Sequence, residues 1–383
     1  MSGDPIGNLS QSVDLVDSCD VVVVGGGLVG SAVAARLAHD GLSVAVLEAR
    51  RLAGGATGRS MGMALLGLPE PYALAVAACG REQAREIWTL TSEGRERLAE
   101  TAARLGVPFE RRGSLRVAET EEDKSVLHAS AELLQTDGFD VWFDHEDPLE
   151  RGFLASLGNP DDLSINGAEL SEALIESAGV MLHEGTEVRG LEADGGGVRV
   201  HSKHRTVHCS MAVLAVDGYA ALLHDYFADR VEPKRILTRA TQPLDQVILE
   251  QPFYVESGHV YGRQLPDRRL LLGGWLGPDA TTRALDSILD IKSGDALSDS
   301  LEAFASRHFP DLASMWTSRW ADVTGFTSDG LPTVGRLPDL PQVFFALGLG
   351  GHSLSWALVV SDRLARLMLE DEDPGLVTAE RFA

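Results

Sequence analysis

The first strong pattern in the chain is a run of apolar residues that leads into a cluster of glycines. Residues 21–24 are four consecutive valines, which is typical of a strand buried on both faces of a parallel sheet. Residues 28–39 predict a helix, and Gly41 fits the position just beyond its C-terminus. Residues 43–47 predict a second buried strand, which leads directly into the acidic residue Glu48.

Three glycines between the first strand and the helix have the G-x-G-x-x-G spacing of a dinucleotide-binding turn. Gly25 permits the tight turn, Gly27 lets a pyrophosphate approach the backbone, and Gly30 lets the helix pack closely on the strand. The helix N-terminus presents amides and the positive end of its dipole to phosphates. Glu48 is placed to bind ribose hydroxyls. Because these parts occur in the required order, the sequence predicts a dinucleotide site.

Further along the chain, helical and strand patterns come in separate blocks. Residues 81–105 have an apolar face at helical spacing, and residues 121–134 predict a second amphipathic helix. This block interrupts the alternation of a dinucleotide fold, which indicates the start of a second domain. The other predicted strands are 107–111, 114–118, 187–191, 198–201, 211–216, 260–263, 269–273 and 344–345, and the other predicted helices are 168–177, one between 284 and 307, and one ending near residue 369.

The order of these blocks predicts an α/β fold with two interleaved domains. A chain of 383 residues is too long for one small core. We expect a Rossmann-like nucleotide domain that is discontinuous in sequence, with an α+β substrate domain built on a mixed sheet. The expected ranges are 1–18 for a flexible leader, 19–80, 150–228 and 318–383 for the nucleotide domain, and 81–149 and 229–317 for the substrate domain.

Charge and cysteine content narrow the class of protein. The formal net charge of −24 argues against nucleic acid or an anionic membrane as a partner, because both bind basic faces. A solubilising acidic surface explains this charge, and a salty cytoplasm would also fit it. No stretch has the apolar length of an integral membrane segment, and residues 1–18 lack the features of a secretory signal. Cys19, Cys79 and Cys209 form no CxxC pair, which predicts no metal site and favours a reducing cytoplasm.

Five stretches in order along nearly the whole chain resemble the flavoprotein amine and amino-acid oxidases, the family of glycine oxidase, sarcosine oxidase and D-amino-acid dehydrogenases. They are residues 22–48, G-A-T-G-R-S-M-G at 55–62, V-L-A-V-D-G-Y at 213–219, G-F-T-S-D-G-L-P-T-V-G at 325–335 and A-L-G-L-G-G-H-S at 346–353. Within the family, A-T-G-R-S, D-G-Y and A-T-Q-P-L at 240–244 are most similar to the γ-glutamylputrescine oxidase branch.

The resemblance implies that the dinucleotide is FAD. The residues that attach flavin covalently in some relatives have no counterpart here, so we expect non-covalent binding. The glycine turn would hold the pyrophosphate, Glu48 the adenosine ribose, and residues 348–354 the flavin pyrimidine. The cofactor-binding residues implied are Gly25, Gly27, Leu28, Val29, Gly30, Glu48, Ala49, Arg50, Ala56, Thr57, Gly58, Arg59, Ser60, Met61, Gly62, Val188, Ala215, Val216, Gly218, Gly348, Gly350, Gly351, His352, Ser353 and Leu354. The segment around Arg59 is also compatible with a flexible surface loop. His352 is also compatible with a histidine that only forms hydrogen bonds within its loop.

The substrate site departs from the family pattern at one position. Many amino-acid oxidases of the family have an arginine where this chain has Thr324, and that arginine grips the substrate carboxylate. The substrate therefore lacks an α-carboxylate, or another arginine binds it. Arg263 is one candidate and Arg239 a weaker one, although either also fits a solvated strand charge. Tyr261 alternates with its neighbours so that it faces either a pocket or the core, and with Arg263 and His352 it completes the candidate substrate residues.

These observations predict an FAD-dependent oxidoreductase. We expect it to oxidise the C–N bond of a primary or secondary amine or amino acid, with hydride transfer to flavin N5 and hydrolysis of the resulting imine. Oxygen, a quinone or another carrier would then take the electrons. Two alternatives remain open at this stage: an NAD-linked dehydrogenase with the same glycine turn, and a flavin-binding subunit without catalytic activity.

Overall fold

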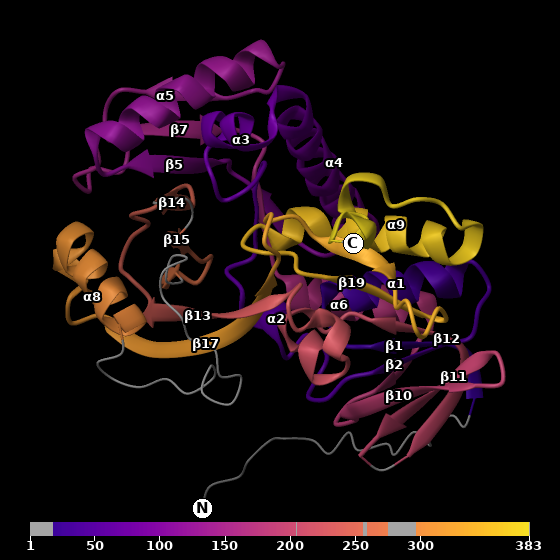
Figure 1. Ribbon diagram of the computed structural model, residues 1–383. Coiled ribbons are helices and arrows are strands. Elements are labelled where there is room, and N and C mark those ends of the chain that lie inside the picture. The colour runs from indigo at the N-terminus through magenta and orange to yellow at the C-terminus, as the bar shows by residue number, and fades with distance from the viewer. Residues whose placement is uncertain (1–17, 204, 256–258, 275–295, 383) are drawn as a thin grey trace, which may run out of the picture.

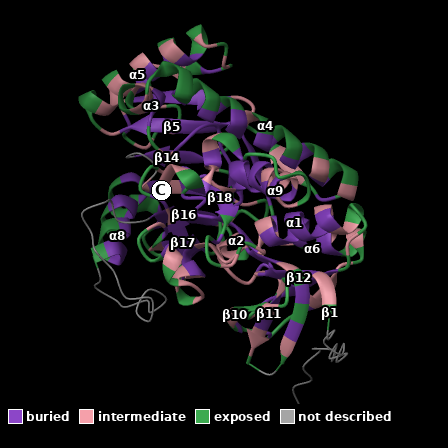
Figure 2. Ribbon diagram, turned by 45° about the vertical axis from the view of Figure 1, so that its right-hand side comes forward, coloured by how far each residue is buried: buried purple, intermediate pink, exposed green. Residues whose placement is uncertain are grey.

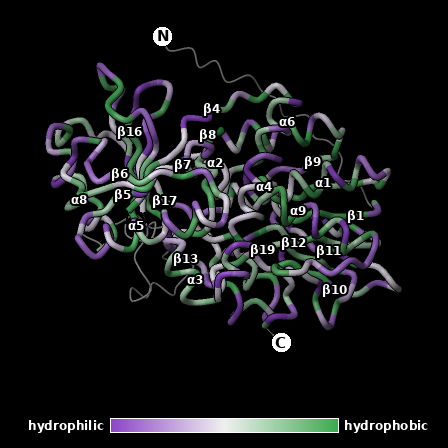
Figure 3. The backbone as a smooth tube through the Cα atoms, turned by 90° about the horizontal axis from the view of Figure 1, so that it is seen from above, coloured by the Kyte–Doolittle hydropathy of each residue, from purple (hydrophilic) through white to green (hydrophobic). Residues whose placement is uncertain are grey.

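The computed structural model describes residues 18–203, 205–255, 259–274 and 296–382. Nearly all of the predicted leader, and residues 284–295 of one predicted helix, lie outside the described residues. The described residues form two eight-stranded sheets and one three-stranded sheet. Figure 1 shows the two large sheets in separate halves of the molecule, and Figure 3 shows from above β5, β6 and β16 on one side with β1 and β10–β12 on the other.

The first sheet is built around β1 (Ser18–Val24), which lies parallel between β12 and β2. The parallel series continues outward from β2 to β9 and from the second half of β12 to β19, while the β10–β11 hairpin extends the first half of β12. The bounds of these strands are β2 (Val44–Leu47), β9 (Met181–His183), β10 (Val188–Asp194), β11 (Gly197–Ser202), β12 (Thr206–Leu214), β18 (Thr333–Arg336) and β19 (Val343–Leu347).

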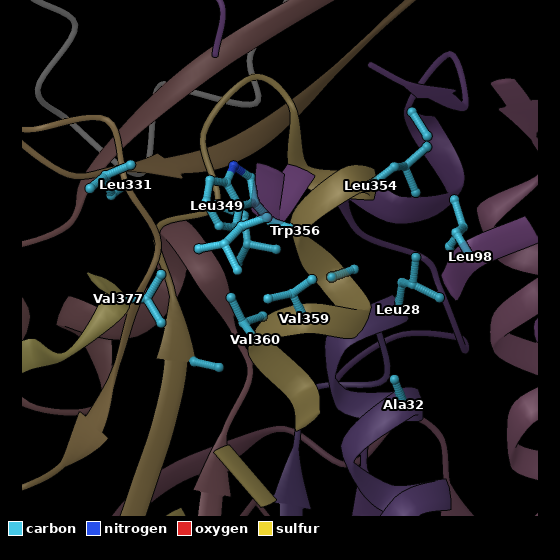
Figure 4. Close-up of a cluster of buried hydrophobic side chains, with 14 of the residues drawn as sticks. Leu28, Ala32, Leu98, Leu331, Leu349, Leu354, Trp356, Val359, Val360 and Val377 are labelled. Carbon is cyan, nitrogen blue, oxygen red and sulfur yellow. The ribbon is translucent and has the colours of Figure 1, made fainter. Parts of the chain in front are cut away.

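Alternating side chains of β1 contribute to two different hydrophobic cores. Val21 and Val23 belong to a cluster with the helices, and Val22 and Val24 belong to a second cluster with the β10–β12 meander. The helices of the first cluster include α1 (Leu28–His39), α4 (Arg81–Leu105), α6 (Gly167–Ala178) and α9 (Ser353–Glu370). Figure 4 shows side chains of α1, α4 and α9 gathered around this cluster, with the fully buried Trp356 among them. The strand buried on both faces that the valine run predicts is therefore present.

The second sheet has the strand order β17-β13-β16-β15-β14-β5-β7-β6. Its pairs are antiparallel except β14 with β5. The strand bounds are β5 (Ser114–Ala118), β6 (Trp142–Asp144), β7 (Ala155–Asn159), β13 (Glu232–Thr241), β14 (Phe253–Val255), β15 (Val260–Gln264), β16 (Leu270–Gly274) and β17 (Trp316–Phe326). Helix α8 (Ala296–His308) packs its apolar side chains on one part of this sheet, and α5 (Glu121–Thr136) packs on another. Figure 2 shows the exposed residues on the outer sides of α4, α5 and α8.

Short elements connect the two large sheets. The small sheet has the order β3 (Met63–Ala64), β8 (Leu163–Ile165), β4 (Phe109–Arg111), and the remaining helices are α2 (Ala56–Arg59) and α3 (Tyr72–Cys79) with short 3-10 turns such as η1 (Asp217–Leu222). Three strands inside the ranges expected for the nucleotide domain pair elsewhere: β7 belongs to the second sheet, and β3 and β8 belong to the small one. Most of β17 also falls in such a range and pairs with β13. The chain thus crosses between the sheets more often than the sequence blocks predict.

Candidate active site

The glycine turn after β1 has the shape that the sequence predicts. Gly25 has φ +104°, and a Cβ there would lie 2.5 Å from the carbonyl oxygen of Ala215. A Cβ at Gly30 would overlap the carbonyl oxygen of Gly25. A Cβ at Gly27, in contrast, would meet only the Thr57 hydroxyl, at 3.1 Å. Gly25 and Gly30 therefore hold strand and helix together, while Gly27 leaves the backbone open to a ligand.

Glu48 is buried beside this turn and accepts two backbone hydrogen bonds. Its Oε2 accepts from the amide of Gly26 at 2.8 Å, and its Oε1 accepts from the amide of Arg50 at 2.7 Å. The Arg50 guanidinium donates to the Tyr219 hydroxyl at 3.1 Å. Each carboxylate oxygen has a second lone pair, so Glu48 can still accept from ribose hydroxyls. The two amides fix its orientation toward the glycine turn.

The segment that begins at α2 is tied to both halves of the molecule. The Thr57 hydroxyl accepts from the Leu28 amide at 3.0 Å, which joins α2 to the start of α1. The Arg59 guanidinium donates to the carbonyl of Ala321 in β17, and the indole N–H of Trp320 donates to the carbonyl of Arg59, both at 3.0 Å. These bonds anchor the segment against β17, so the flexible surface loop considered from the sequence is not what the structure contains.

Asp217 joins three of the motifs, a role that the sequence analysis missed. Its Oδ2 accepts from the Gly325 amide at 2.7 Å, and its Oδ1 accepts from the Gly348 amide at 2.9 Å. The residue has φ +47°, in the left-handed region that few side chains adopt. Burial raises the pKa of Asp217, and these amides partly offset that effect. The D-G-Y motif predicts cofactor contacts for the neighbours Ala215, Val216 and Gly218, but nothing in it indicates the distant amides that Asp217 binds.

A cavity lies where α2, the start of α9 and the second sheet meet. His352 lines it from the residue before α9, and Tyr254, Tyr261, Asp322 and Thr324 line it from strands of the second sheet. The other lining residues are Ala56, Ser60, Met61, Gly62, Met63, Leu65, Ile236, Gly350, Gly351, Ser353 and Leu354. Several predicted cofactor residues and two of the three predicted substrate residues, Tyr261 and His352, therefore come together here.

Asp322 is the one acidic residue that lines this cavity. It lies opposite Ile236 in the β13–β17 pair, and only 4% of its surface is exposed. Its Oδ1 is buried and has no hydrogen-bond partner in the described part of the chain. Burial raises the pKa of this carboxyl to about 7, although the nearby Arg59 charge and the Thr324 hydroxyl lower it. Asp322 was not predicted, because a buried acid in a strand has no sequence signature.

His352 is buried and neutral. Its Nδ1 lies 2.8 Å from the carbonyl oxygen of Gly67, and because a carbonyl only accepts, Nδ1 carries the hydrogen. Burial lowers the pKa of His352 to about 3, and the Arg116 charge adds to this. The ring meets Tyr254 edge-on at 5.7 Å. This histidine therefore presents an unprotonated Nε2 and brings no charge to the cavity.

The two candidate arginines lie outside the residues that line the cavity. The Arg263 guanidinium donates to the Met61 carbonyl at 2.7 Å and pairs with Glu110 at 3.2 Å. Arg239 stacks over the ring of Trp316 at 5.1 Å. Arg263 is thus buried and paired rather than a solvated strand charge, and it supports the backbone of the segment that lines the cavity.

The start of α9 and the loop before it line the same cavity. The first amides of a helix have no intrahelical acceptor, and they lie at the positive end of its dipole. Gly350 has φ +62°, and its amide donates to the Gly325 carbonyl at 3.0 Å, which fixes the loop before the helix. These amides suit an electron-rich ring edge. The open glycine turn, Glu48 and this helix start together fit the parts of an FAD molecule; the individual contacts of the residues implied by the resemblance, Val188 among them, stay predictions.

The fold and these parts define a flavin-dependent oxidoreductase, and comparison with known proteins gives the family. Residues 20–367 match the family described as DAO, FAD dependent oxidoreductase, and the chain belongs to this family. It is 25% identical to a glycine oxidase of Geobacillus kaustophilus, over 86% of this chain and 87% of the relative. It is 24% identical to the gamma-glutamylputrescine oxidoreductase of Escherichia coli K12, over 99% of this chain and 87% of the relative.

A solved structure has the same fold. The glycine oxidase of Bacillus cereus superposes with a TM-score of 0.78 at 22% identity, covering 94% of this chain and 97% of that one. The predicted α/β fold, the FAD cofactor and the enzyme class of amine and amino-acid oxidases are confirmed. Among the helices of the described residues, none combines the length and apolar character needed to cross a membrane.

Proposed function

We propose that this enzyme oxidises the C–N bond of a primary or secondary amine. The observation that carries the proposal is the cavity itself. It adjoins the start of α9, it is lined by Met61, Met63, Leu65 and Ile236, and its lining includes one buried acid, Asp322, and one neutral histidine, His352. The similarity to a glycine oxidase and to a gamma-glutamylputrescine oxidoreductase supports an amine or amino acid as the substrate.

In this proposal the two large sheets have separate tasks. The first sheet, with the glycine turn and Glu48, holds the nucleotide half of FAD without a covalent link. The second sheet supplies Tyr254, Tyr261 and Asp322 to the substrate side of the cavity. Arg59 connects the two, because its side chain reaches from α2 to the Ala321 carbonyl in β17. The nucleotide domain would thus comprise the first sheet and its helices, and the substrate domain the second sheet.

When bound, FAD supplies a ring whose N5 accepts a hydride from the carbon beside the substrate nitrogen. The chain contributes orientation and a dry environment. Apolar side chains around the cavity exclude water, which favours the neutral form of an amine, and only the neutral amine has a lone pair to support hydride loss. The unprotonated His352 Nε2 adds no positive charge that would repel a cationic amine on entry. The imine produced would be hydrolysed by water.

We propose a reducing, cytoplasmic location, which the three free cysteines support.

We propose oxygen, a quinone or another carrier as the electron acceptor. Admitting air to protein that an amine has reduced distinguishes these acceptors. Prompt return of the flavin spectrum identifies oxygen, and return only with an added quinone identifies a carrier.

Isotopic substitution tests the hydride step. An amine with deuterium on the carbon beside nitrogen should reduce the flavin more slowly than the unlabelled amine, because that C–H bond breaks in the step that reduces the ring. The reaction is followed as loss of flavin absorbance after rapid anaerobic mixing, and the released carbonyl compound is measured against the flavin reduced. Deuterium at a remote carbon is the control and should not alter the rate. Reduction without a stoichiometric carbonyl product would rule out C–N oxidation.

A further inference from the structure

Asp322 differs from the other acidic groups in the site because it lines the cavity and has an oxygen without a partner. Asp217 is also buried, but its two oxygens accept from backbone amides of Gly325 and Gly348. The Glu48 oxygens are likewise occupied by amides. Asp322 Oδ1 has no such donor in the described residues. A buried carboxylate oxygen is costly to leave unpaired, so a partner from outside the chain is the natural donor.

The charges around the cavity favour a cation over an anion. Of the residues that line it, only Asp322 is negatively charged at pH 8, above its pKa of about 7, and His352 is neutral. Three arginines near the cavity donate to groups of the chain. Arg263 donates to Met61 and Glu110, and the Arg59 side chain donates to Ala321. Arg116 donates to the carbonyl oxygens of Leu68 and Pro69 and to the Tyr254 hydroxyl. No ion pair within 4.0 Å joins any of the three to Asp322 in the described residues. A substrate carboxylate placed here would face the Asp322 carboxylate, and no arginine lines the cavity in the described residues.

The register of the second sheet places Asp322 on the substrate side. Thr324 is two residues along β17, so both side chains point to the same face, and both line the cavity. Tyr261 reaches the same face from β15, and the charge of Asp322 raises the pKa of Tyr261, which indicates that the two groups are close. Asp322 therefore lies where a side chain of β17 can contact a substrate bound in the cavity.

We propose that Asp322 binds a cationic nitrogen of the substrate, so that the enzyme takes amines with no carboxylate on the oxidised carbon. This inference rests on the proposed amine oxidation and names its substrate class. Asp322 acts as the specificity-determining residue: its Oδ1 accepts a charge-assisted hydrogen bond from the ammonium group, while Met61, Met63 and Ile236 contact the aliphatic part. Before oxidation the ammonium group passes the proton of this hydrogen bond to the Asp322 carboxylate, which leaves the neutral amine that hydride loss requires. Amino acids, whose carboxylate would meet Asp322, are rejected.

The test uses two ligands that share a tert-butyl group, carry opposite charges and cannot be oxidised by the enzyme. tert-Butylamine has no hydrogen on the carbon beside its nitrogen, and pivalate is its carboxylate counterpart. Each is titrated into the FAD-loaded protein at pH 8, and binding is followed as a shift of the flavin absorbance. We expect the wild type to bind tert-butylamine at least about 10-fold more tightly than pivalate, as one charge-assisted hydrogen bond predicts.

Asp322→Asn should weaken tert-butylamine binding by about 10- to 100-fold and leave pivalate binding unchanged or stronger. Asp322→Glu keeps the charge and should keep the preference for the cation. Asp299→Asn, on the exposed side of α8, is the matched control and should behave as wild type. Equal binding of both ligands by the wild type, or an equal loss of both in Asp322→Asn, would overturn the inference.

The outcomes separate this inference from the proposed function. If the preference for the cation depends on Asp322 but no amine reduces the flavin, the binding site stands and the amine oxidation fails. If amines reduce the flavin while Asp322→Asn keeps the wild-type preference, the oxidation stands and the role of Asp322 fails.

Discussion

Gly30→Val is expected to yield a protein that no longer retains FAD. Even one added carbon at this position would overlap the Gly25 carbonyl oxygen, which is backbone and cannot turn aside. Helix α1 must then move away from β1, and the helix N-terminus moves with it. A forced backbone shift of this kind costs about 1–3 kcal/mol or more, which corresponds to at least about a 10- to 100-fold loss of FAD affinity. FAD released by acid after gel filtration, relative to protein, measures the effect.

A second glycine provides the matched control. Gly190 in β10 has open space where a Cβ would stand, so Gly190→Ala should retain FAD as the wild type does. Circular dichroism of both variants distinguishes a local loss of the cofactor from unfolding. A folded Gly30→Val protein with a full complement of FAD would show that the turn between β1 and α1 is not the pyrophosphate site.

Asp322→Asn is expected to make the protein more stable above pH 7. In the unfolded chain an aspartate carboxyl has a pKa of 3.8, whereas burial raises that of Asp322 to about 7. Between pH 4 and pH 7 the folded protein therefore keeps a proton on Asp322 that the unfolded chain has released. The stability that the protonated side chain contributes is complete below pH 4 and is lost as the pH rises to 7. Asparagine has no such loss. The variant should gain about 4 kcal/mol relative to wild type at pH 8, and less at lower pH.

Urea unfolding of both proteins at pH 5 and pH 8 measures this difference. The stability gap between variant and wild type should be larger at pH 8 by roughly 2–3 kcal/mol. The charged groups that influence Asp322 are Arg59, which lowers its pKa, and Asp217, which raises it; the Thr324 hydroxyl also lowers it. Tyr261 faces the same carboxyl and stays neutral in this range, because its own pKa is raised. A gap of the same size at both pH values would contradict the assigned ionisation.

The expected effect of Asp322 on stability above pH 7 is unfavourable, so we expect this residue to have a functional role. An uncompensated buried charge is costly, and natural sequences keep such groups mainly where function requires them. The expected gain in stability and loss of cation binding on Asp322→Asn would together show that trade-off in one side chain. The two measurements are independent, since unfolding does not depend on a substrate.

Elements with strong local signals could be predicted from the sequence. The predicted helices 28–39 and 81–105 have the bounds observed for α1 and α4, because each has an apolar face and a glycine near its C-terminus. The glycine turn and Glu48 also lie together as predicted, since the motif fixes a strand, a turn and a helix that are adjacent in the chain. Local sequence determines these features.

Side chains whose role depends on distant partners could not be predicted. Asp217 is defined by amides of Gly325 and Gly348, more than 100 residues away. Arg263 was placed on the correct strand, but the Met61 carbonyl and Glu110 decide where its guanidinium points. Asp322 reaches the cavity only because β17 pairs with β13 in one register, and a slip by one residue would turn it to the other face.

The most direct test of the central claim is an anaerobic absorbance scan of the purified protein before and after amines are added. The amines are glycine, sarcosine, D-amino acids, proline, putrescine and γ-glutamylputrescine. We predict a flavin spectrum that loses its absorbance with putrescine or γ-glutamylputrescine, whose oxidised carbon bears no carboxylate, and that persists with the amino acids. A flavin spectrum that no amine alters would contradict amine oxidation, and a protein without flavin that does not bind added FAD would contradict the account at its base.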